Sequence, residues 1–229
     1  MGTSGWLYDW NEGATLEWYV VESGLNAVEL NASFYRFPFR NQVASWSKKG
    51  GSLRWSIKVH RLITHVYRLS DKAYGTWEKF RNLFSQMDKF IDFFLFQLPP
   101  NYKCSSDQLA RIEKFHRETE LGARMALEFR HGSCFTHEVV KWATENDLTL
   151  VSIDAPIVTW IVTSNENLYL RMHGREVWYG YEYTAKELAE IAERIRDLAP
   201  RRVYVFFNND HWMLENARVM LELLHEVFS

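Results

Sequence analysis

The sequence predicts a single (β/α)8 TIM barrel that spans residues 1–229. Short runs of alternating apolar and polar residues recur along the chain, and amphipathic, helix-like stretches follow most of them. Strands that alternate with helices indicate a parallel sheet with crossover connections. Eight such runs in a chain with no internal linker favour a closed barrel over an open sheet. The runs are GTSGW, AVELNAS, RWSIKVH, FFLFQLP, MALEFRH, LTLVSID, LYLRMHG and RVYVFFNN.

Three of the intervening stretches carry specific helix signals. SDQLARIEKFHRETE opens with a Ser-Asp cap, and Thr184 and Glu187 have the spacing of a capping box. DHWMLENARVMLELLHEVF is apolar at helical spacing and predicts a closing helix. The segment between Asp154 and Asn167 contains Pro156 and is too short for a good helix. We therefore expect a weak or missing helix after the sixth strand, replaced by a loop or one helical turn.

Composition restricts the class of protein. Hydrophobic residues make up 47% of the chain and aromatic residues 16%, enough for a sizeable core, and the net charge of −2 does not indicate a nucleic-acid or membrane surface. Cys104 and Cys134 are too far apart in sequence to indicate a disulfide framework or a metal motif, so we expect a reducing compartment. No run is long enough to span a membrane, and the strand-like GTSGW follows Met1 directly. We expect a cytoplasmic protein without a signal peptide or membrane partner.

The polar faces of the strands indicate where a site would lie. In a barrel the more apolar face of each strand packs under the helices, and the other face lines the interior. Polar residues fall at the C-terminal ends of their strands, where active sites of TIM barrels lie. For the sixth strand, this reasoning sends Ser152 and Asp154 inward. The residues expected to share one pocket are Glu29, Asn31, Lys58, His60, Gln97, Glu128, Arg130, Asp154, Arg171, His173 and Asn208.

Several of these residues have catalytic chemistry. His60 and His173 can titrate near neutrality, and Glu128 and Asp154 come from adjacent strands and suit an acid/base pair. Lys58 suits an electrostatic clamp, a general base or a Schiff-base amine, whereas an ion pair with Glu29 on the next strand is the simpler alternative. The catalytic candidates are His60, Glu128, Asp154, Lys58 and Glu29.

The remaining residues suit substrate binding. Arg130 and Arg171 have the geometry to bind a carboxylate or phosphate in a bidentate manner. Aromatic residues crowd the same end of the chain's strands and would stack a base or sugar, form a lid, or simply pack the loops. The substrate-binding candidates are Asn31, Gln97, Arg130, Arg171, His173, Asn208 and, at the rim, Tyr35.

We expect neither a metal nor a cofactor. The sequence has no HxH, HExxH or CxxC spacing, and the three cations Lys58, Arg130 and Arg171 oppose a metal cluster electrostatically. No glycine-rich nucleotide fingerprint is present.

The motifs together resemble those of the DUF72 (YecE-like) family. The resemblance rests on GTSGW, VELNASFYR, KVHRLITH, LFQLPP, LEFRHGS, SID, YLRMHG and YVFFNN, in this order along essentially the whole chain. It implies a TIM-barrel fold, but no reaction, because the biochemical function of that family is not established. It also implies a distant likeness to barrel endonucleases that act at abasic sites. The segment LYDWNEGATLEWYV is shorter than is typical and lacks the usual aromatic-Pro element.

Three functional hypotheses follow. The first is an enzyme that acts on a small anionic, sugar- or phosphate-bearing substrate at the C-terminal mouth of the barrel. The second is a nucleic-acid binding or repair protein that uses aromatic and arginine residues in the loops. The third is a non-catalytic barrel, because three cations and three carboxylates in the predicted pocket would neutralise one another as a structural network.

Overall fold

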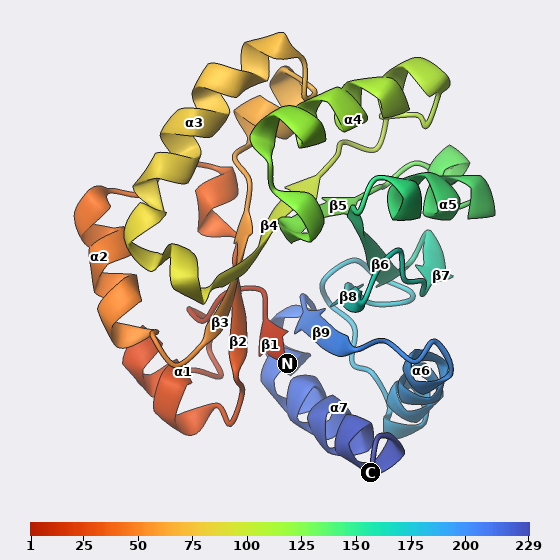
Figure 1. Ribbon diagram of the computed structural model, residues 1–229. Helices are drawn as coiled ribbons and strands as arrows, with labels where there is room; N and C mark the ends of the chain where they lie inside the picture. The colour runs from red at the N-terminus through yellow and green to blue at the C-terminus, as the bar shows by residue number, and fades with distance from the viewer.

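The strands of the chain form one barrel, seen along its axis in Figure 1. The computed structural model describes all residues, 1–229, and places nine strands in a single sheet. The sheet closes where β5 pairs with β6, through Ala126 with Thr149 and Leu127 with Leu150. The parallel strands are β1 (Gly2–Thr3), β2 (Ala27–Leu30), β3 (Arg54–Lys58), β4 (Ile91–Gln97), β5 (Met125–Glu128), β6 (Thr149–Ala155), β8 (Asn167–Met172) and β9 (Arg202–Phe207). The predicted TIM barrel is thereby confirmed.

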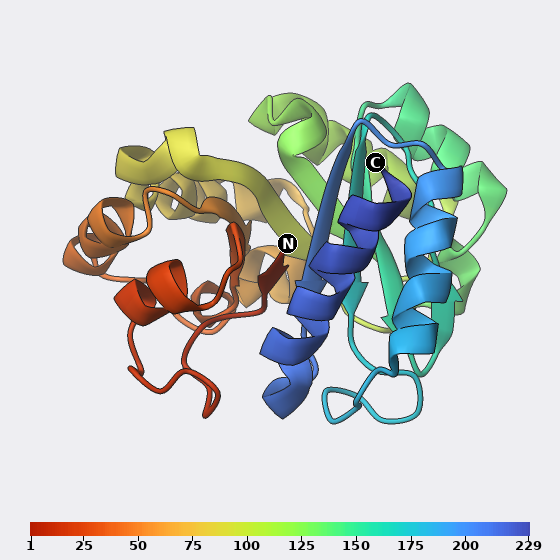
Figure 2. The same cartoon turned by 90° about the horizontal axis from the view of Figure 1, so that it is seen from below.

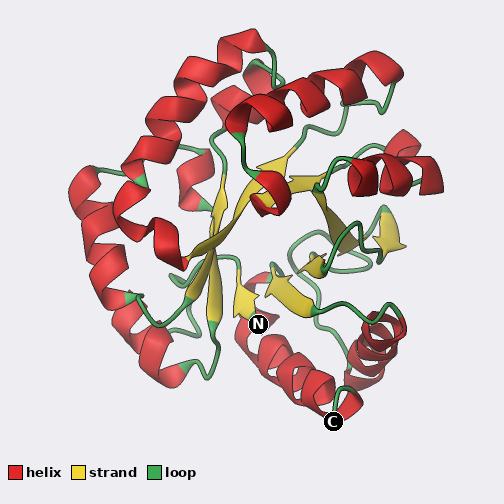
Figure 3. Cartoon of the chain, in the orientation of Figure 1, coloured by secondary structure: helices red, strands yellow, loops and turns green.

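Seven α-helices surround the barrel (Figures 1 and 3). The capping box predicted at Thr184 is present, because the Thr184 hydroxyl accepts from the Glu187 backbone while the Glu187 side chain accepts from the Thr184 backbone. The helices are α1 (Leu16–Glu22), α2 (Arg40–Lys49), α3 (Tyr74–Leu83), α4 (Ser106–Thr119), α5 (His137–Glu145), α6 (Ala185–Asp197) and α7 (Met213–Val227). None of them is long and apolar enough to cross a membrane.

The ring of helices is interrupted after β6, as the sequence predicts. The connection instead contains the short strand β7 (Val158–Trp160), which folds back antiparallel on the end of β6. The expected loop or helical turn is therefore wrong in detail. Val158, Thr159 and Trp160 are β-branched or aromatic, and such residues favour an extended chain over a single helical turn.

Two apolar layers hold the barrel together. The larger lies between the strands and the helices and includes Val28, Ile57, Leu127 and Leu170. The smaller fills the barrel interior and is formed by Ala27, Phe93, Leu95, Ala126, Val151, Ile153, Ala155, Tyr169 and Phe206. The interior is therefore solidly packed below its C-terminal end, as a TIM barrel requires.

The faces of β6 are the reverse of those predicted. Val151 and Ile153 belong to the interior layer, so Ser152 and Asp154 point outward. Because no helix follows β6, its outer face at Ser152 meets the backbone of the β7 connection, and the Ser152 hydroxyl accepts from Val162 N at 2.9 Å. The backbone of this connection thus supplies hydrogen-bond partners for the polar outer face of β6. The rule that the apolar face lies under helices fails because the helix is missing.

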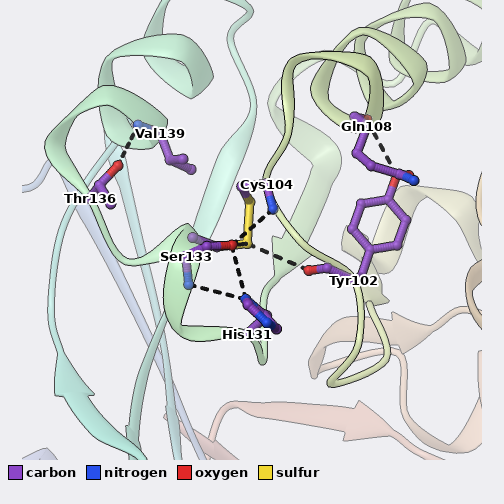
Figure 4. Close-up of a disulfide and its surroundings, with 8 residues drawn as sticks. Tyr102, Cys104, Gln108, His131, Ser133, Thr136 and Val139 are labelled. Carbon is purple, nitrogen blue, oxygen red and sulfur yellow. Dashed lines mark hydrogen bonds between the residues drawn. A yellow bond between two sulfur atoms is a disulfide. The ribbon is translucent and has the colours of Figure 1, made fainter.

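The two cysteines form a disulfide, which contradicts the expectation of separate thiols. Cys104 and Cys134 are 30 residues apart in sequence, but their Cα atoms lie 5.2 Å apart (Figure 4). They come from the segments that follow β4 and β5, which are neighbouring strands. The Ser133 hydroxyl also accepts from the backbone N–H of Cys104 at 3.1 Å. Distance along the sequence does not reveal this pairing, whereas the adjacency of the two βα loops does.

Candidate functional site: an ionic cluster at the mouth of the barrel

The C-terminal ends of the parallel strands, with the segments that follow them, form what we call the mouth. Figure 2 shows the barrel from the side, with the segments after β1 (red) and β8 (light blue) projecting at the same end. The side chains described below leave the last residues of β2, β3, β5 and β8. They lie above the interior apolar layer.

Glu29 and Arg171 form the centre of the site. Both side chains are completely buried, and the guanidinium of Arg171 donates to both carboxylate oxygens of Glu29, at 2.6 and 2.9 Å. The remaining acceptor positions of Glu29 are also used, because Ser4 Oγ, Asn31 Nδ2 and Tyr169 OH donate to it at 2.8, 2.9 and 2.6 Å. A bidentate, fully hydrogen-bonded pair of this kind withstands burial.

Arg171 also reaches a second carboxylate on the opposite side. Its Nη1 donates to Glu128 Oε2 at 2.6 Å, and Nε of Arg130 donates to Glu128 Oε1. Arg130 in turn lies over the ring of Trp178, 4.5 Å from its centroid, in a cation–π contact. The two glutamates and two arginines, here called the ion-pair cluster, cancel each other's charge.

Both carboxylates of the ion-pair cluster stay ionised. Burial alone would raise the pKa of Glu29, but Arg171 and the Tyr169 hydroxyl hold it below its ordinary value. Burial acts in the same direction on Glu128, and Arg130 and Arg171 nevertheless hold its pKa well below the ordinary range. A carboxylate with a lowered pKa does not supply a proton at neutral pH. The expected role of these two residues as acids or bases gains no support from their surroundings.

His173 is neutral and completely buried beside the ion-pair cluster. Arg130 Nη2 and Arg171 Nη1 lie 2.9 and 3.4 Å from its Nε2, and Asn208 Nδ2 lies 3.2 Å from its Nδ1. A guanidinium only donates, so Nε2 must accept. Burial, reinforced by Arg130 and Arg171, lowers the pKa of His173 well below its ordinary value. The imidazole therefore positions Arg130 rather than carrying charge.

Lys58 is the cation that the ion-pair cluster does not neutralise. Its side chain is 8% exposed, and its Nζ lies 4.6 Å from the centroid of the Phe34 ring without forming a hydrogen bond or ion pair. Burial and then Arg171 lower the pKa of Lys58 to about 7, against the opposing attraction of Glu128 and Glu29. The Glu29–Lys58 ion pair that sequence reasoning favoured is therefore wrong, because Arg171 occupies both oxygens of Glu29.

Two predicted residues lie apart from the ion-pair cluster. His60 is buried, but its Nδ1 accepts from Leu62 N at 3.2 Å and its ring packs edge-on against Phe37. Asp154 points away from the interior, where the Thr159 hydroxyl and Nε of Arg175, the latter at 3.1 Å, donate to it. Neither residue bonds to the other predicted candidates, so the expected pairing of Glu128 with Asp154 is wrong.

The other predicted residues take peripheral positions. Asn208 contacts His173 and Asn31 contacts Glu29, whereas the Gln97 amide donates to Leu98 O at 3.2 Å and does not reach the ion-pair cluster. Tyr35 is 71% exposed and lies at the rim, as predicted.

Four residues that shape the site were not among the predicted site residues, although Trp178 was expected as one of the aromatic residues at this end of the strands. Ser4 and Tyr169 complete the shell around Glu29, and Trp178 covers Arg130. His65 packs edge-on against Phe34, the same ring that Lys58 contacts. Alternation placed Tyr169 on the inner face of its strand, so that residue had a usable signal. Ser4, His65 and Trp178 lie outside the strands, where periodicity gives no position.

A cavity of about 470 Å³ opens at the edge of the mouth, between α1, α2 and the ends of β1 and β2. Its wall includes Ser4 and Asn31, which bond to Glu29, together with Trp6, Trp46 and Arg36. A larger hollow of about 620 Å³ lies between α3 and the end of α4 and contains no residue of the predicted site. No group of three His, Cys, Asp or Glu side chains is arranged to hold a metal ion.

Exposed apolar side chains surround the mouth. Most of the large hydrophobic residues that reach solvent lie in segments that directly follow barrel strands. Tyr35 and Phe39 are 71% and 70% exposed. The complete set, here called the apolar rim, is Leu7, Tyr35, Phe39, Leu62, Val66, Ile157, Val177, Tyr179 and Trp212.

The fold and the ion-pair cluster define a TIM-barrel protein with a charged mouth. The model of the DUF72 family, described as a protein of unknown function, matches residues 1–228, and the chain belongs to that family. Two solved structures of DUF72 family proteins are similar. One, from Enterococcus faecalis, is 22% identical over 98% of this chain and 94% of its own, with a TM-score of 0.84. The other, from Thermotoga maritima, is 23% identical over 100% and 98%, with a TM-score of 0.78. A comparison with curated proteins finds no match.

Proposed function

We propose that the protein is an enzyme that binds a small anionic substrate at the mouth, next to Lys58. The observation that carries this proposal is the charge balance of the site. Glu29, Glu128, Arg130 and Arg171 neutralise one another, which leaves the ammonium of Lys58 as the uncompensated charge. A cation in partly desolvated surroundings attracts an anion more strongly than one in water does.

The proposal changes the roles that were expected of the arginines. Every nitrogen of the Arg171 guanidinium already donates to a glutamate, and Arg171 has no exposed surface. It positions the glutamates rather than binding substrate. Lys58 takes over the role of anion anchor. The cavity at the edge of the mouth, whose wall includes Arg36 and Asn31 but not Lys58, offers space for the rest of a substrate.

Thermal unfolding in the presence of small anions tests the proposal. Inorganic sulfate, pyruvate and glycerol phosphate are compared with chloride at matched ionic strength. At pH 6, where Lys58 is protonated, we expect at least one of them to raise Tm in the wild type and in Lys58→Arg, but not in Lys58→Met. Lys141→Met is the matched control, because Lys141 is an exposed lysine that pairs with Glu145 on α5 and lines neither the mouth nor the cavity. Equal shifts in the wild type and Lys58→Met would contradict the proposal.

Nucleic-acid binding is the second candidate function, and the apolar rim favours it. Tyr35, Phe39, Tyr179 and Trp212 are exposed aromatic residues of three different segments, and aromatic platforms stack single-stranded bases. Binding of a labelled single-stranded oligonucleotide that weakens as salt increases would support this candidate. Loss of that binding in Tyr35→Ala and Phe39→Ala, with Lys58→Met unaffected, would separate it from the anion site.

A further inference from the structure

Lys58 combines three properties that rarely occur together in a lysine. Its amine is buried, it is free of any ion pair, and it sits at the end of a barrel strand where substrates of TIM barrels bind. We propose that Lys58 forms an imine with the substrate, so that the anion bound at the mouth is an aldehyde or a ketone. This inference rests on the proposed function and names the class of substrate and the bond that forms.

The position of the amine is fixed by its surroundings. The backbone carbonyl of Lys58 accepts from the Ser33 hydroxyl at 2.7 Å, which ties the end of β3 to the segment after β2. The side chain then lies along Phe34, whose ring contacts Nζ. A lysine held in this way keeps its amine at one point of the mouth instead of sweeping through solvent.

The charges around Lys58 favour the neutral amine that imine formation needs. Arg171 from β8 and Arg130 beyond the end of β5 repel a proton on Nζ, while Glu128 and Glu29 attract one. Both carboxylates are already bound by arginine, so deprotonation of Lys58 breaks no ion pair. His65, from the segment after β3, and Tyr35 also pack against the Phe34 ring. The pKa of His65 is lowered to about 4 by burial and by the charges of Lys58, Arg61 and Arg68. About half of the Lys58 amine is therefore neutral at pH 7.

The bond changes balance without a further reactant. The lone pair of the neutral amine attacks the carbonyl carbon, so that a C–N bond forms and the π bond of the carbonyl breaks. The nitrogen then gives up a proton and the oxygen takes one up, which gives a carbinolamine. The oxygen takes up a second proton from the solvent and leaves as water, and a protonated C=N bond remains. Neutral His65 suits the transfer of the proton from nitrogen to oxygen, because Nδ1 contacts the Thr64 hydroxyl at 2.9 Å while Nε2 has no partner in the protein. Its ring and Nζ of Lys58 both contact Phe34.

Reductive trapping tests the inference. The protein is incubated at pH 7 with pyruvate, glyoxylate or glycolaldehyde phosphate and with cyanoborohydride, and the product is analysed by intact mass and peptide mapping. At pH 7 an amine with a pKa of about 7 holds on the order of a thousandfold more neutral form than an exposed lysine. We therefore expect that Lys58 is the only lysine to carry an adduct, which Lys141→Met retains. Peptide mapping resolves this adduct from any on the N-terminal amine, whose pKa burial lowers to about 6.

The variants Lys58→Arg and Lys58→Met separate failure of the inference from failure of the proposed function. Lys58→Arg keeps the charge but cannot form an imine, so it should lose the adduct and keep the anion-dependent rise in Tm. If no probe reacts at Lys58 while the anion shift still depends on that residue, the imine is overturned and the anion site stands. If the adduct forms at Lys58 and no anion shift is found, the proposed anion site fails. Adducts spread over many lysines of the wild type would also overturn the imine, and this readout needs no variant to fold.

Discussion

Lys58 makes stability depend on pH in a direction opposite to that of a salt-bridged lysine, because its pKa is lowered and not raised. Its pKa is about 7 in the folded chain and near 10.4 when unfolded, so between these values the unfolded state binds more protons. Stability due to this group therefore rises with pH over that window. Below pH 7 the full free-energy cost of burying the charged ammonium of Lys58 is present.

We expect Lys58→Met to stabilise the protein at pH 6, by an amount on the order of 4 kcal/mol for a shift of this size, and much less at pH 10. Urea unfolding at the two pH values measures the difference, with Lys141→Met as an exposed control. If Lys58→Met has the same effect at both pH values, the depressed pKa of Lys58 is contradicted.

Alternation of polar residues was sufficient to place Glu29, Lys58, Glu128 and Arg171 on the inner face of the barrel. It was not sufficient to predict which carboxylate pairs with which cation. Glu29 and Lys58 are on neighbouring strands, but Arg171 has the longer, forked side chain and takes both oxygens of Glu29. Partner choice in a closed barrel depends on reach across the interior, which a strand pattern does not contain.

At the level of elements, the disulfide joins the segments after β4 and β5. In the chain-entropy account, a closed loop with a sequence separation of 30 is worth about 3–4 kcal/mol. We therefore expect the double variant Cys104→Ser, Cys134→Ser to unfold at a lower urea concentration, with a free energy of unfolding about 3–4 kcal/mol below that of the wild type. A reductant should lower the unfolding free energy of the wild type toward that of the variant, and it should leave the unfolding free energy of the variant unchanged. A variant as stable as the oxidised wild type would refute this.

The segment between β8 and α6 depends on Arg175. Its guanidinium donates to Asp154 and to Glu187, both at 3.1 Å, and Asp154 is completely buried. Arg175→Met leaves that carboxylate without its cation, and we expect a loss of about 3 kcal/mol. Hydrogen exchange should increase in residues 174–183, which include Trp178. The exposed pair Arg201–Glu166 supplies the control, because Arg201→Met should change stability by less than about 1 kcal/mol.

The order of strands and helices was predictable because the hydrophobic periods are regular and three of the intervening stretches carry specific helix signals. Which side chains of β6 face inward and which face outward was not predictable from the sequence. The missing helix was predicted from Pro156 and the short connection, yet its consequence for Ser152 and Asp154 depends on what replaces the helix. Only the folded β7 connection supplies backbone partners for a polar outer face.

For the molecule as a whole, Arg171 is a brace across the barrel. It belongs to β8, yet it binds Glu29 of β2 and Glu128 of β5, neither of which is adjacent to β8 in the sheet. Arg171→Met should therefore weaken the whole barrel, by about 3–5 kcal/mol at pH 7, because two buried carboxylates lose their shared cation.

The pH dependence of this variant has a definite sign. In the wild type the pKa values of Glu29 and Glu128 are lowered, so their contribution is complete above the unfolded pKa near 4.3 and is lost as pH falls further. In Arg171→Met the carboxylates are destabilised while ionised, so protonation relieves them. The gap in unfolding free energy between wild type and variant should shrink from pH 7 to pH 4. A difference in unfolding free energy that is the same at pH 7 and pH 4 would contradict the role of Arg171 as the shared cation of two buried carboxylates.

The apolar rim has a practical consequence for how the molecule is attached to a surface. A cluster of exposed apolar side chains adsorbs to hydrophobic materials, and adsorption through this end would bury Lys58 against the support. Figure 2 shows the C-terminus, which follows α7, at the opposite end of the barrel from the loops after β1 and β8. A tether at the C-terminus therefore leaves the mouth facing the solution, which is the orientation that a sensor-chip measurement of anion or oligonucleotide binding requires.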